Sequence, residues 1–130
     1  MQKLVKLEQI PQEVEGQQIE VDQQWPNMGQ ITFEHIQLRY RPNTEIILDK
    51  LCFAIGSCKK IGICGRTGAG KSTIALTLSR IVELESGTIL IDGVDISKVN
   101  LRTLRNKITV IPQDPTLFRG SLRFNLDPFN

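Results

Sequence analysis

Apolar and polar residues alternate over residues 31–40, the pattern of a half-buried β-strand. The parity of the apolar positions changes after Phe33, which predicts a bulge or kink near His35. A turn follows, and a second alternating run over residues 46–55 predicts a second strand. We expect the two strands to pair in antiparallel orientation.

Three later segments also have the pattern of strands. Residues 61–64 and 108–111 are short continuous apolar runs, which predict buried strands of a parallel sheet covered by helices on both faces. Residues 86–91 predict another strand, followed by a tight turn at Asp92 and Gly93.

Helical spacing predicts one longer and two short helices. The longer helix begins at about Lys71 and stops before Gly87. Its apolar face is formed by Ile74, Leu78, Ile81 and Val82. Asn100 and Ser121 are predicted to cap the two short helices that follow them.

The segment between the run 61–64 and the longer helix carries the strongest chemical signal. Its sequence, Gly65-Arg66-Thr67-Gly68-Ala69-Gly70-Lys71-Ser72, has the spacing G-x-x-x-x-G-K-[ST] of a phosphate-binding loop. The glycines let the backbone curl and approach a ligand, and the curled N–H groups and the helix N-terminus favour an anion. Lys71 would reach the β- and γ-phosphates, and the Ser72 hydroxyl would bind Mg²⁺. A glycine-rich turn that binds nothing is the alternative, but the complete match between a strand and a helix favours phosphate binding.

Two other residues have alternative interpretations on pattern alone. Tyr40 precedes the first loop glycine by 25 positions. It could stack on a purine, although a core or rim aromatic is the commoner role. Asp92 ends an apolar strand, as the Mg²⁺-binding acid that accompanies a phosphate loop does. Because Gly93 follows it, a hairpin turn is favoured.

Composition narrows the classes of function. The 130 residues form one domain at most, with a net charge of +2. Residues 1–35 carry two Lys and six Asp/Glu (net −4), whereas residues 36–130 carry fourteen Lys/Arg and eight Asp/Glu (net +6). No basic run is interleaved with aromatics, so nucleic acid is not favoured as a ligand. We expect no signal peptide and no membrane span, because no apolar stretch approaches the roughly 20 residues required.

Two further features concern the cysteines and the N-terminal segment. The three cysteines, Cys52, Cys58 and Cys64, form no C-x-x-C pair, which favours neither zinc nor a disulfide framework and suits a reducing, cytosolic setting. Residues 1–30 are rich in Gln, Glu and Pro and are predicted to be a linker. Within it, Trp25 is expected to cover the edge of the core.

From about Trp25 onward, the chain resembles the ATP-binding domain of ABC transporters. It resembles in particular the second such domain of the multidrug-resistance-associated (ABCC) subfamily. The segments that carry the resemblance are residues 25–26, 29–33, 38–42, 62–73, 91–93, 111–115, 120–123 and 125–129. Arg66 inside the loop and the closing Asn-Leu-Asp-Pro of residues 125–128 point to the subfamily.

The resemblance implies a set of site residues. ATP would be held by Tyr40, Gly65, Arg66, Thr67, Gly68, Ala69, Gly70, Lys71, Ser72 and Thr73. Within this set, Tyr40 takes the place of the adenine-stacking aromatic. Gln113 takes the place of the glutamine that approaches Mg²⁺ and the attacking water, in a loop that meets the membrane domain. Lys71 and Gln113 would then act in catalysis, Ser72 and Gln113 at Mg²⁺, and Asp92 would lie in a hairpin away from the metal.

The sequence departs from the family pattern in two places. Cys58-Lys59-Lys60 replaces Gly-Glu-Lys, so that a turn glycine has become Cys58. In addition, residues 31–130 match only the first half of the domain. The signature segment, the acidic strand with its catalytic Glu and the switch histidine have no counterpart, and His35 lies too early to serve. We therefore expect an α/β fold: a truncated P-loop NTPase (ABC ATPase) core with an antiparallel β subdomain.

These observations lead to a functional expectation with two alternatives. The chain would bind MgATP as part of an exporter's energy-coupling domain, beside transmembrane domains and a second ATP-binding domain on the cytoplasmic face of a membrane. Alone, it would hydrolyse ATP negligibly. One alternative is a stand-alone, non-catalytic binding fragment that competes for a transporter's partner domain. The other, a GTPase or small-molecule kinase, is disfavoured because Thr109 stands where the Asn-Lys-x-Asp guanine reader needs an acid.

Overall fold

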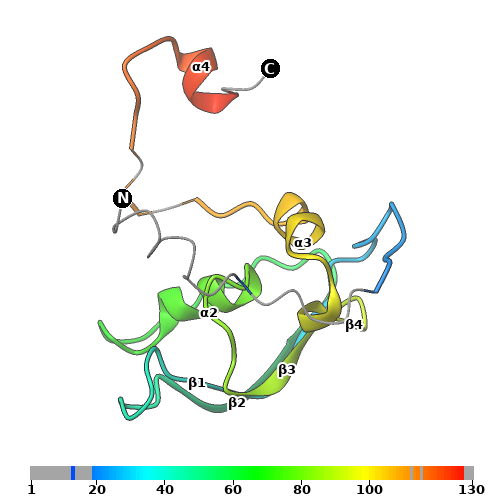
Figure 1. The fold of residues 1–130 in the computed structure, drawn as a ribbon, viewed down its shortest axis with the longest axis vertical. Helices are drawn as coiled ribbons and strands as arrows, with labels where there is room; N and C mark the ends of the chain where they lie inside the picture. Colours follow the sequence, from blue (N-terminus) through cyan, green and yellow to red (C-terminus); the bar gives the residue numbers. More distant parts are fainter. Residues whose placement is uncertain (1–12, 14–18, 112, 115, 128–130) are drawn as a thin grey trace, which may run out of the picture.

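The computed structural model of the chain describes residues 13, 19–111, 113–114 and 116–127. Its strands form one four-stranded antiparallel sheet (Figure 1). The strand order is β2-β1-β3-β4. The strands are β1 (Ile31–Leu38), β2 (Leu48–Ile55), β3 (Ser86–Ile91) and β4 (Val94–Asp95). The predicted antiparallel pairing of β1 and β2 is confirmed, with Phe33 opposite Phe53.

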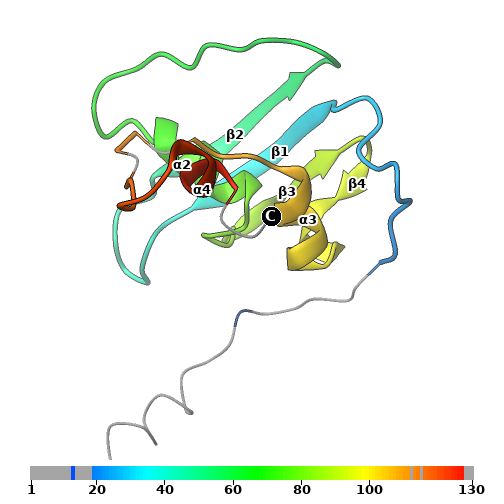
Figure 2. The same cartoon turned by 90° about the horizontal axis from the view of Figure 1, so that it is seen from above.

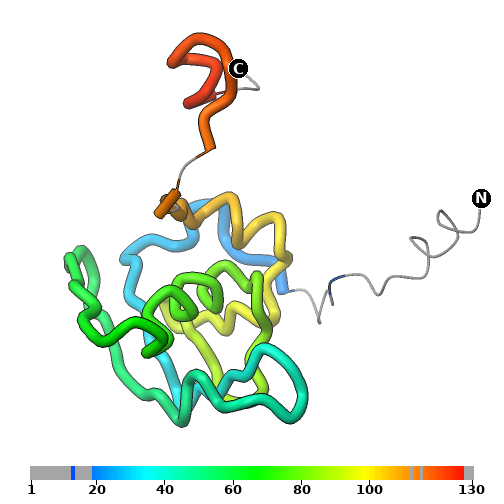
Figure 3. Tube along the Cα trace, turned by 90° about the vertical axis from the view of Figure 1, so that its left-hand side faces the viewer, coloured from blue at the N-terminus to red at the C-terminus, as the bar shows by residue number. Residues whose placement is uncertain are grey.

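Helices cover one face of this sheet. The covering elements are α2 (Lys71–Leu78), the 3₁₀ turn η1 (Ile96–Lys98) and α3 (Leu101–Lys107), and a further helix, α4 (Leu122–Leu126), follows later in the chain. Figures 1 and 2 show α2 and α3 over the same face of the sheet. In Figures 1 and 3, α4 lies away from the sheet, at the end of an extended segment. The N-caps predicted for α3 and α4 are confirmed: the Asn100 side chain accepts from the Arg102 amide at 2.9 Å, and the Ser121 hydroxyl accepts from the Phe124 amide at 3.1 Å.

The predicted bulge in β1 is confirmed at His35, which has a φ of 47°. The register with β2 shifts between Phe33 and Ile36. Because the extra residue re-aims the strand, Phe33, Ile36 and Leu38 are all fully buried despite their different parity. The bulge therefore explains the change of pattern in the sequence.

The hydrophobic core lies between the sheet and the helices. Its buried members are Trp25, Phe33, Ile36, Leu38, Leu48, Ile89, Ile91, Ile96, Val99 and Leu104. The rings of Phe33 and Phe53 stack with their centroids 4.3 Å apart. Trp25 is 5% exposed, which confirms that it covers the edge of the core.

Two predicted strands are wrong in this structure. Residues 61–64 and 108–111 form no strand, and Ile63 and Ile111 are 47% and 87% exposed. A strand exists only when its backbone pairs with a neighbour, and neither run is part of the sheet in the described parts of the chain. The predicted burial of the two runs is not found either, because an apolar composition does not by itself supply a neighbouring strand.

The predicted end of the longer helix is also wrong. The helix α2 ends at Leu78, and Ile81, placed by prediction on its apolar face, is 59% exposed. The cause is Arg80, which has a φ of 49° and a guanidinium that donates to the carbonyl oxygens of Ile96 and Val99, both at 3.2 Å. The left-handed backbone of Arg80 turns the chain out of the helix one residue after its C-cap, and the two bonds hold its side chain against η1 and the residue that follows it.

The segment before β1 is attached to α3 and η1. The Ile19 amide donates to the Lys98 carbonyl at 2.8 Å. Glu13 accepts two hydrogen bonds from the Arg105 guanidinium, at 2.7 and 2.8 Å, and this contact lowers the pKa of the Glu13 carboxyl. An acidic residue of the first part of the chain thus pairs with a basic residue of the remainder. No helix in the described parts of the chain is both long enough and apolar enough to cross a bilayer.

Candidate functional site

The phosphate loop, residues 65–72, leads into α2, which begins at Lys71 as predicted. Gly70 occupies the N-cap with a φ of 78°, and no side chain caps the helix. A Cβ on Gly70 would lie 2.9 Å from Leu48 Cδ2 and 3.2 Å from the Ile47 carbonyl oxygen. Both conformation and space therefore require glycine here, since the loop packs against the start of β2. The first N–H groups of α2 remain available to a ligand.

The Lys71 side chain folds back over the loop. Its Nζ donates to the carbonyl oxygens of Gly65 and Arg66 at 2.8 and 2.6 Å. The loop is further closed by a bond of 3.1 Å from the Ala69 amide to the Arg66 carbonyl. The ammonium is thus held on the same short segment as the open amides at the start of α2. This combination of a fixed cation and uncapped N–H groups suits a phosphate.

A cavity of about 540 Å³ brings most of the predicted site residues together. It is lined by Tyr40, Ile47, Thr67, Gly68, Gly70, Lys71, Ser72, Thr73 and Gln113. Gly65, Arg66 and Ala69 belong to the same loop but do not line the cavity. Ile47 was not predicted, because an isoleucine before a strand is indistinguishable by type from a core residue.

Tyr40 lies at the edge of this cavity, two residues beyond the end of β1. Its ring is half exposed, and its hydroxyl is 2.9 Å from Thr73 Oγ1 in the first turn of α2. Tyr40 is therefore a rim aromatic whose ring remains accessible beside the phosphate loop. Its stacking on adenine stays a prediction.

Ser72 and Gln113 supply the oxygen atoms that Mg²⁺ prefers. Both side chains are exposed and line the same cavity, and the Ser72 hydroxyl makes no hydrogen bond to another described residue. Within the described ranges, no three His, Cys, Asp or Glu side chains gather in a way that could hold a metal ion. Mg²⁺ commonly takes one or two protein ligands and completes its shell with phosphates and water, so this donor set fits Mg²⁺ held together with a nucleotide.

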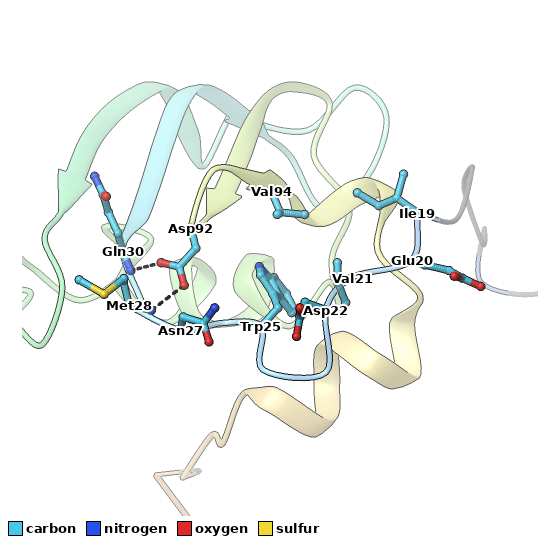
Figure 4. Close-up of a pocket in the computed structure, with 10 residues that line it drawn as sticks. All are labelled: Ile19, Glu20, Val21, Asp22, Trp25, Asn27, Met28, Gln30, Asp92 and Val94. Atoms are coloured by element: carbon cyan, nitrogen blue, oxygen red, sulfur yellow. Dashed lines mark hydrogen bonds between the residues drawn. The ribbon is translucent and has the colours of Figure 1, made fainter.

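Asp92 does not line the cavity at the phosphate loop and lies in the tight turn between β3 and β4. It has a φ of 50° and is followed by Gly93 at 76°, which confirms the hairpin. Its carboxylate accepts from the amides of Met28 and Gln30, both at 2.8 Å (Figure 4), and from the amide of Gly29 at 3.1 Å. Desolvation raises the pKa of Asp92, but these amides outweigh it and leave the pKa below its ordinary value.

Asp92 also lines a second, separate cavity of about 470 Å³. Trp25 and the segment before β1 form the other wall (Figure 4). Asp92 therefore anchors residues 28–30, just before β1, and does not line the cavity at the phosphate loop.

The comparisons with known proteins agree with this geometry. The family model described as ABC transporter matches residues 48–125. The chain belongs to the ABC transporter family. ABC transporter C family member 13 of Dictyostelium discoideum is 50% identical over 123 residues, which are 93% of this chain and 9% of that protein. Human ATP-binding cassette sub-family C member 2 is 56% identical over 106 residues, 82% of this chain and 8% of that protein.

The structural comparison extends the match to the whole chain. A bacterial Atm1-family ABC exporter with ATP bound superposes with a TM-score of 0.84 at 31% identity, covering 99% of this chain and 22% of that one. The resemblance to the C subfamily and the fold class, a P-loop ABC ATPase core with an antiparallel β subdomain, are therefore confirmed. This ABC transporter chain spans less than a tenth of the length of its curated relatives.

Proposed function

We propose that this chain binds MgATP as part of the energy-coupling domain of an ABC-type exporter. The observation that carries the proposal is the cavity that joins Tyr40, the phosphate loop and Gln113, which are up to 73 positions apart in the chain. A purine nucleotide needs an aromatic platform, an anion cradle and a cation ligand in one place, and this cavity contains all three.

Each group has a distinct role in this proposal. The Tyr40 ring stacks on adenine, while the open amides of α2 and the Lys71 ammonium bind the β- and γ-phosphates. Ser72 and Gln113 hold Mg²⁺ together with those phosphates. The metal ion would neutralise part of the negative charge of the phosphates. The residues of this chain supply position and fixed dipoles, which are one part of what phosphoryl transfer requires.

Within these 130 residues, we infer binding without hydrolysis. Among the residues that the structure describes, no Asp or Glu lines the cavity at the phosphate loop. Asp92 is bound to backbone amides in a hairpin and lines another cavity. In the whole transporter, we propose that transmembrane domains and a second ATP-binding domain at the cytoplasmic face of a membrane complete the site and couple hydrolysis to export.

A titration of the full chain with MgATP tests this function. We expect amide shifts at residues 65–73 in two-dimensional NMR spectra. In Lys71→Ala the affinity should fall by about 10- to 100-fold, the value of a charge-assisted hydrogen bond. The matched control is Lys60→Ala, an exposed lysine outside the cavity. Equal affinity for GTP and ATP that is unchanged by Tyr40→Ala would instead favour another class of phosphate-loop enzyme.

A phosphate-release assay tests the absence of hydrolysis separately. We expect no steady release above the level of Lys71→Ala. Steady release that disappears in Lys71→Ala would overturn this part of the proposal and leave the binding part standing.

A further inference from the structure

The Tyr40 hydroxyl and the Thr73 hydroxyl form a hydrogen bond of 2.9 Å between two elements of the nucleotide cavity. Tyr40 follows β1, and Thr73 is the third residue of α2, directly after the Lys71-Ser72 pair of the phosphate loop. Both residues line the same cavity of about 540 Å³. The bond thus links the platform proposed for the base to the segment proposed for the phosphates.

Thr73 is well placed to fix the ring, because its own position is fixed. Its side chain is 4% exposed, whereas Tyr40 is 50% exposed. A half-exposed tyrosine samples several rotamers, and freezing them when a ligand binds reduces affinity. A bond to a buried, β-branched threonine in a helix limits this freedom before any ligand arrives.

The next threonine of α2 shows that this arrangement is not a general property of the helix. Thr77 lies one turn further on and is 1% exposed, but its hydroxyl donates to the Ile74 carbonyl at 2.8 Å, within its own helix. Helical threonines commonly bond in this way to the preceding turn. At Thr73 the hydroxyl reaches across to Tyr40 instead.

The chemistry of the pair allows it to bind a ligand as well. A hydroxyl has one proton and two acceptor lone pairs, and either hydroxyl of this pair can be the donor. When Tyr40 donates to Thr73, the Thr73 proton remains available for a phosphate oxygen. Each bond in such a chain polarises the next, so stacking of the base and binding of the phosphate become energetically coupled.

We propose that Thr73 is a positioning residue that sets the orientation of Tyr40 and couples base recognition to phosphate binding. The proposal rests on the proposed function and deepens it. It predicts that the Tyr40 hydroxyl, which would not touch the base in a stacked complex, contributes to ATP affinity through Thr73 alone.

The test is a double-mutant cycle on the full chain, with MgATP and magnesium tripolyphosphate as the two probes. We expect Tyr40→Phe to weaken ATP binding by about three- to tenfold, the loss for one side chain that must be immobilised. In the Thr73→Val background the same change should have no further effect, because the hydroxyl has already lost its partner. Tripolyphosphate, which has no base, should show a much smaller loss in Tyr40→Phe.

Two further variants separate positioning from a general effect on the helix. Thr73→Ser keeps the hydroxyl and should restore the coupling to Tyr40. Thr77→Val removes an equally buried hydroxyl and should leave the coupling intact. Because Tyr40 is the sole tyrosine of the chain, isotope-labelled tyrosine gives a single set of NMR signals. Without ligand, the Hα–Hβ couplings of Tyr40 should report a single χ1 rotamer in the parent chain and in Thr77→Val. In Thr73→Val they should take the averaged values of a ring that samples several rotamers.

The outcomes distinguish the inference from the function. If ATP binds and Tyr40→Phe binds it as tightly as the parent chain, or loses the same factor in the Thr73→Val background, Thr73 does not position the ring and only this inference fails. If the parent chain does not bind MgATP, the proposed function fails and the inference fails with it. Tyr40→Phe removes only the hydroxyl of a half-exposed residue, so the cycle retains a folded variant even if Thr73→Val does not fold.

Discussion

The indole nitrogen of Trp25 donates a hydrogen bond of 3.0 Å to the carbonyl oxygen of Ile91, at the end of β3. The two residues are 66 positions apart. This bond brings a residue from before the first strand into the core, where Trp25 is 5% exposed. The packed unit therefore includes part of the segment that the sequence pattern assigns to a linker.

Replacing Trp25 tests how much this contact stabilises the fold. We expect Trp25→Phe to lower the free energy of unfolding by about 1–2 kcal/mol, because the hydrogen bond and some volume are lost. Trp25→Ala should lower it by about 3–5 kcal/mol, the usual loss for a buried aromatic. Urea unfolding followed by circular dichroism measures both, and Met28→Ala, at a side chain 62% exposed, is the control. If Trp25→Ala and the control variant are equally stable, the Trp25 contact does not stabilise the fold.

Gly87 and Gly93 offer a matched test of the bulge. Both have positive φ, 87° and 76°. A Cβ on Gly87 would lie 2.5 Å from the His35 carbonyl oxygen and 2.6 Å from that of Glu34, whereas a Cβ on Gly93 would meet nothing within 4 Å. Gly93→Ala should therefore destabilise the fold by about 1–2 kcal/mol through backbone conformation alone.

Gly87→Ala has the same unfavourable backbone conformation, and in addition its Cβ would clash with the backbone of Glu34 and His35. We expect its destabilisation to exceed that of Gly93→Ala by about 1–3 kcal/mol, the usual effect of overpacking. Thermal or urea unfolding of the two variants under identical conditions gives the difference. If the two variants are equally stable, β1 does not bulge toward Gly87 in solution.

Local features of this fold could be predicted from sequence, and long-range pairing could not. The parity change after Phe33 located the bulge, and the cap residues Asn100 and Ser121 located two helix starts, because each signal lies within a few residues of its effect. The runs 61–64 and 108–111 were predicted as strands because they are apolar. Strand formation depends on a neighbouring backbone, which no local pattern specifies.

In the candidate site too, local features could be predicted from the sequence and long-range contacts could not. The spacing of residues 65–72 predicted a phosphate loop, and Lys71 begins α2 as that spacing requires. The place of Gln113 beside the loop could be expected only from resemblance to a family, because no spacing relates them. The bond between Tyr40 and Thr73 had no signal at all, since two hydroxyls 33 positions apart meet only once the chain has folded.

Cys58 provides a test in which a substitution should stabilise the chain. It has a φ of 56° and an exposed side chain, at a position where the family pattern has glycine. Cys58→Gly removes the strain of a left-handed non-glycine residue, about 1–2 kcal/mol, and loses part of this gain through greater freedom of the unfolded chain. We expect a net gain of about 0.5–1 kcal/mol in the free energy of unfolding.

The control for this substitution is Cys52→Gly. Cys52 is also exposed but lies in β2, where its conformation is extended. Glycine in a strand should destabilise the fold by about 0.5–1 kcal/mol. The two changes have the same chemistry and opposite expected signs, so a loss of stability in both would show that Cys58 is not strained.

The pH dependence of stability should report the contact between Asp92 and the segment before β1. The amides of Met28, Gly29 and Gln30 hold the pKa of Asp92 below its ordinary value, although desolvation opposes them. The carboxylate form is thus favoured in the folded state. The contribution of this carboxylate to the free energy of unfolding is complete above the pKa of Asp in the unfolded chain, about 3.9. It is lost as the pH falls through the lower pKa of Asp92 in the folded chain.

We expect Asp92→Asn to be less stable than the parent chain near neutral pH, because its side chain has one acceptor oxygen and an NH₂ group that would face the amide donors. The difference in unfolding free energy should shrink as the pH falls through the acid range, where the parent chain loses the carboxylate. Urea midpoints measured from about pH 6 to pH 3 give this difference. Asp49→Asn is the control, since the exposed Asp49 carboxylate accepts no hydrogen bond from another described residue. A difference that stays constant over this range would show that the amides do not hold the ionised form of Asp92.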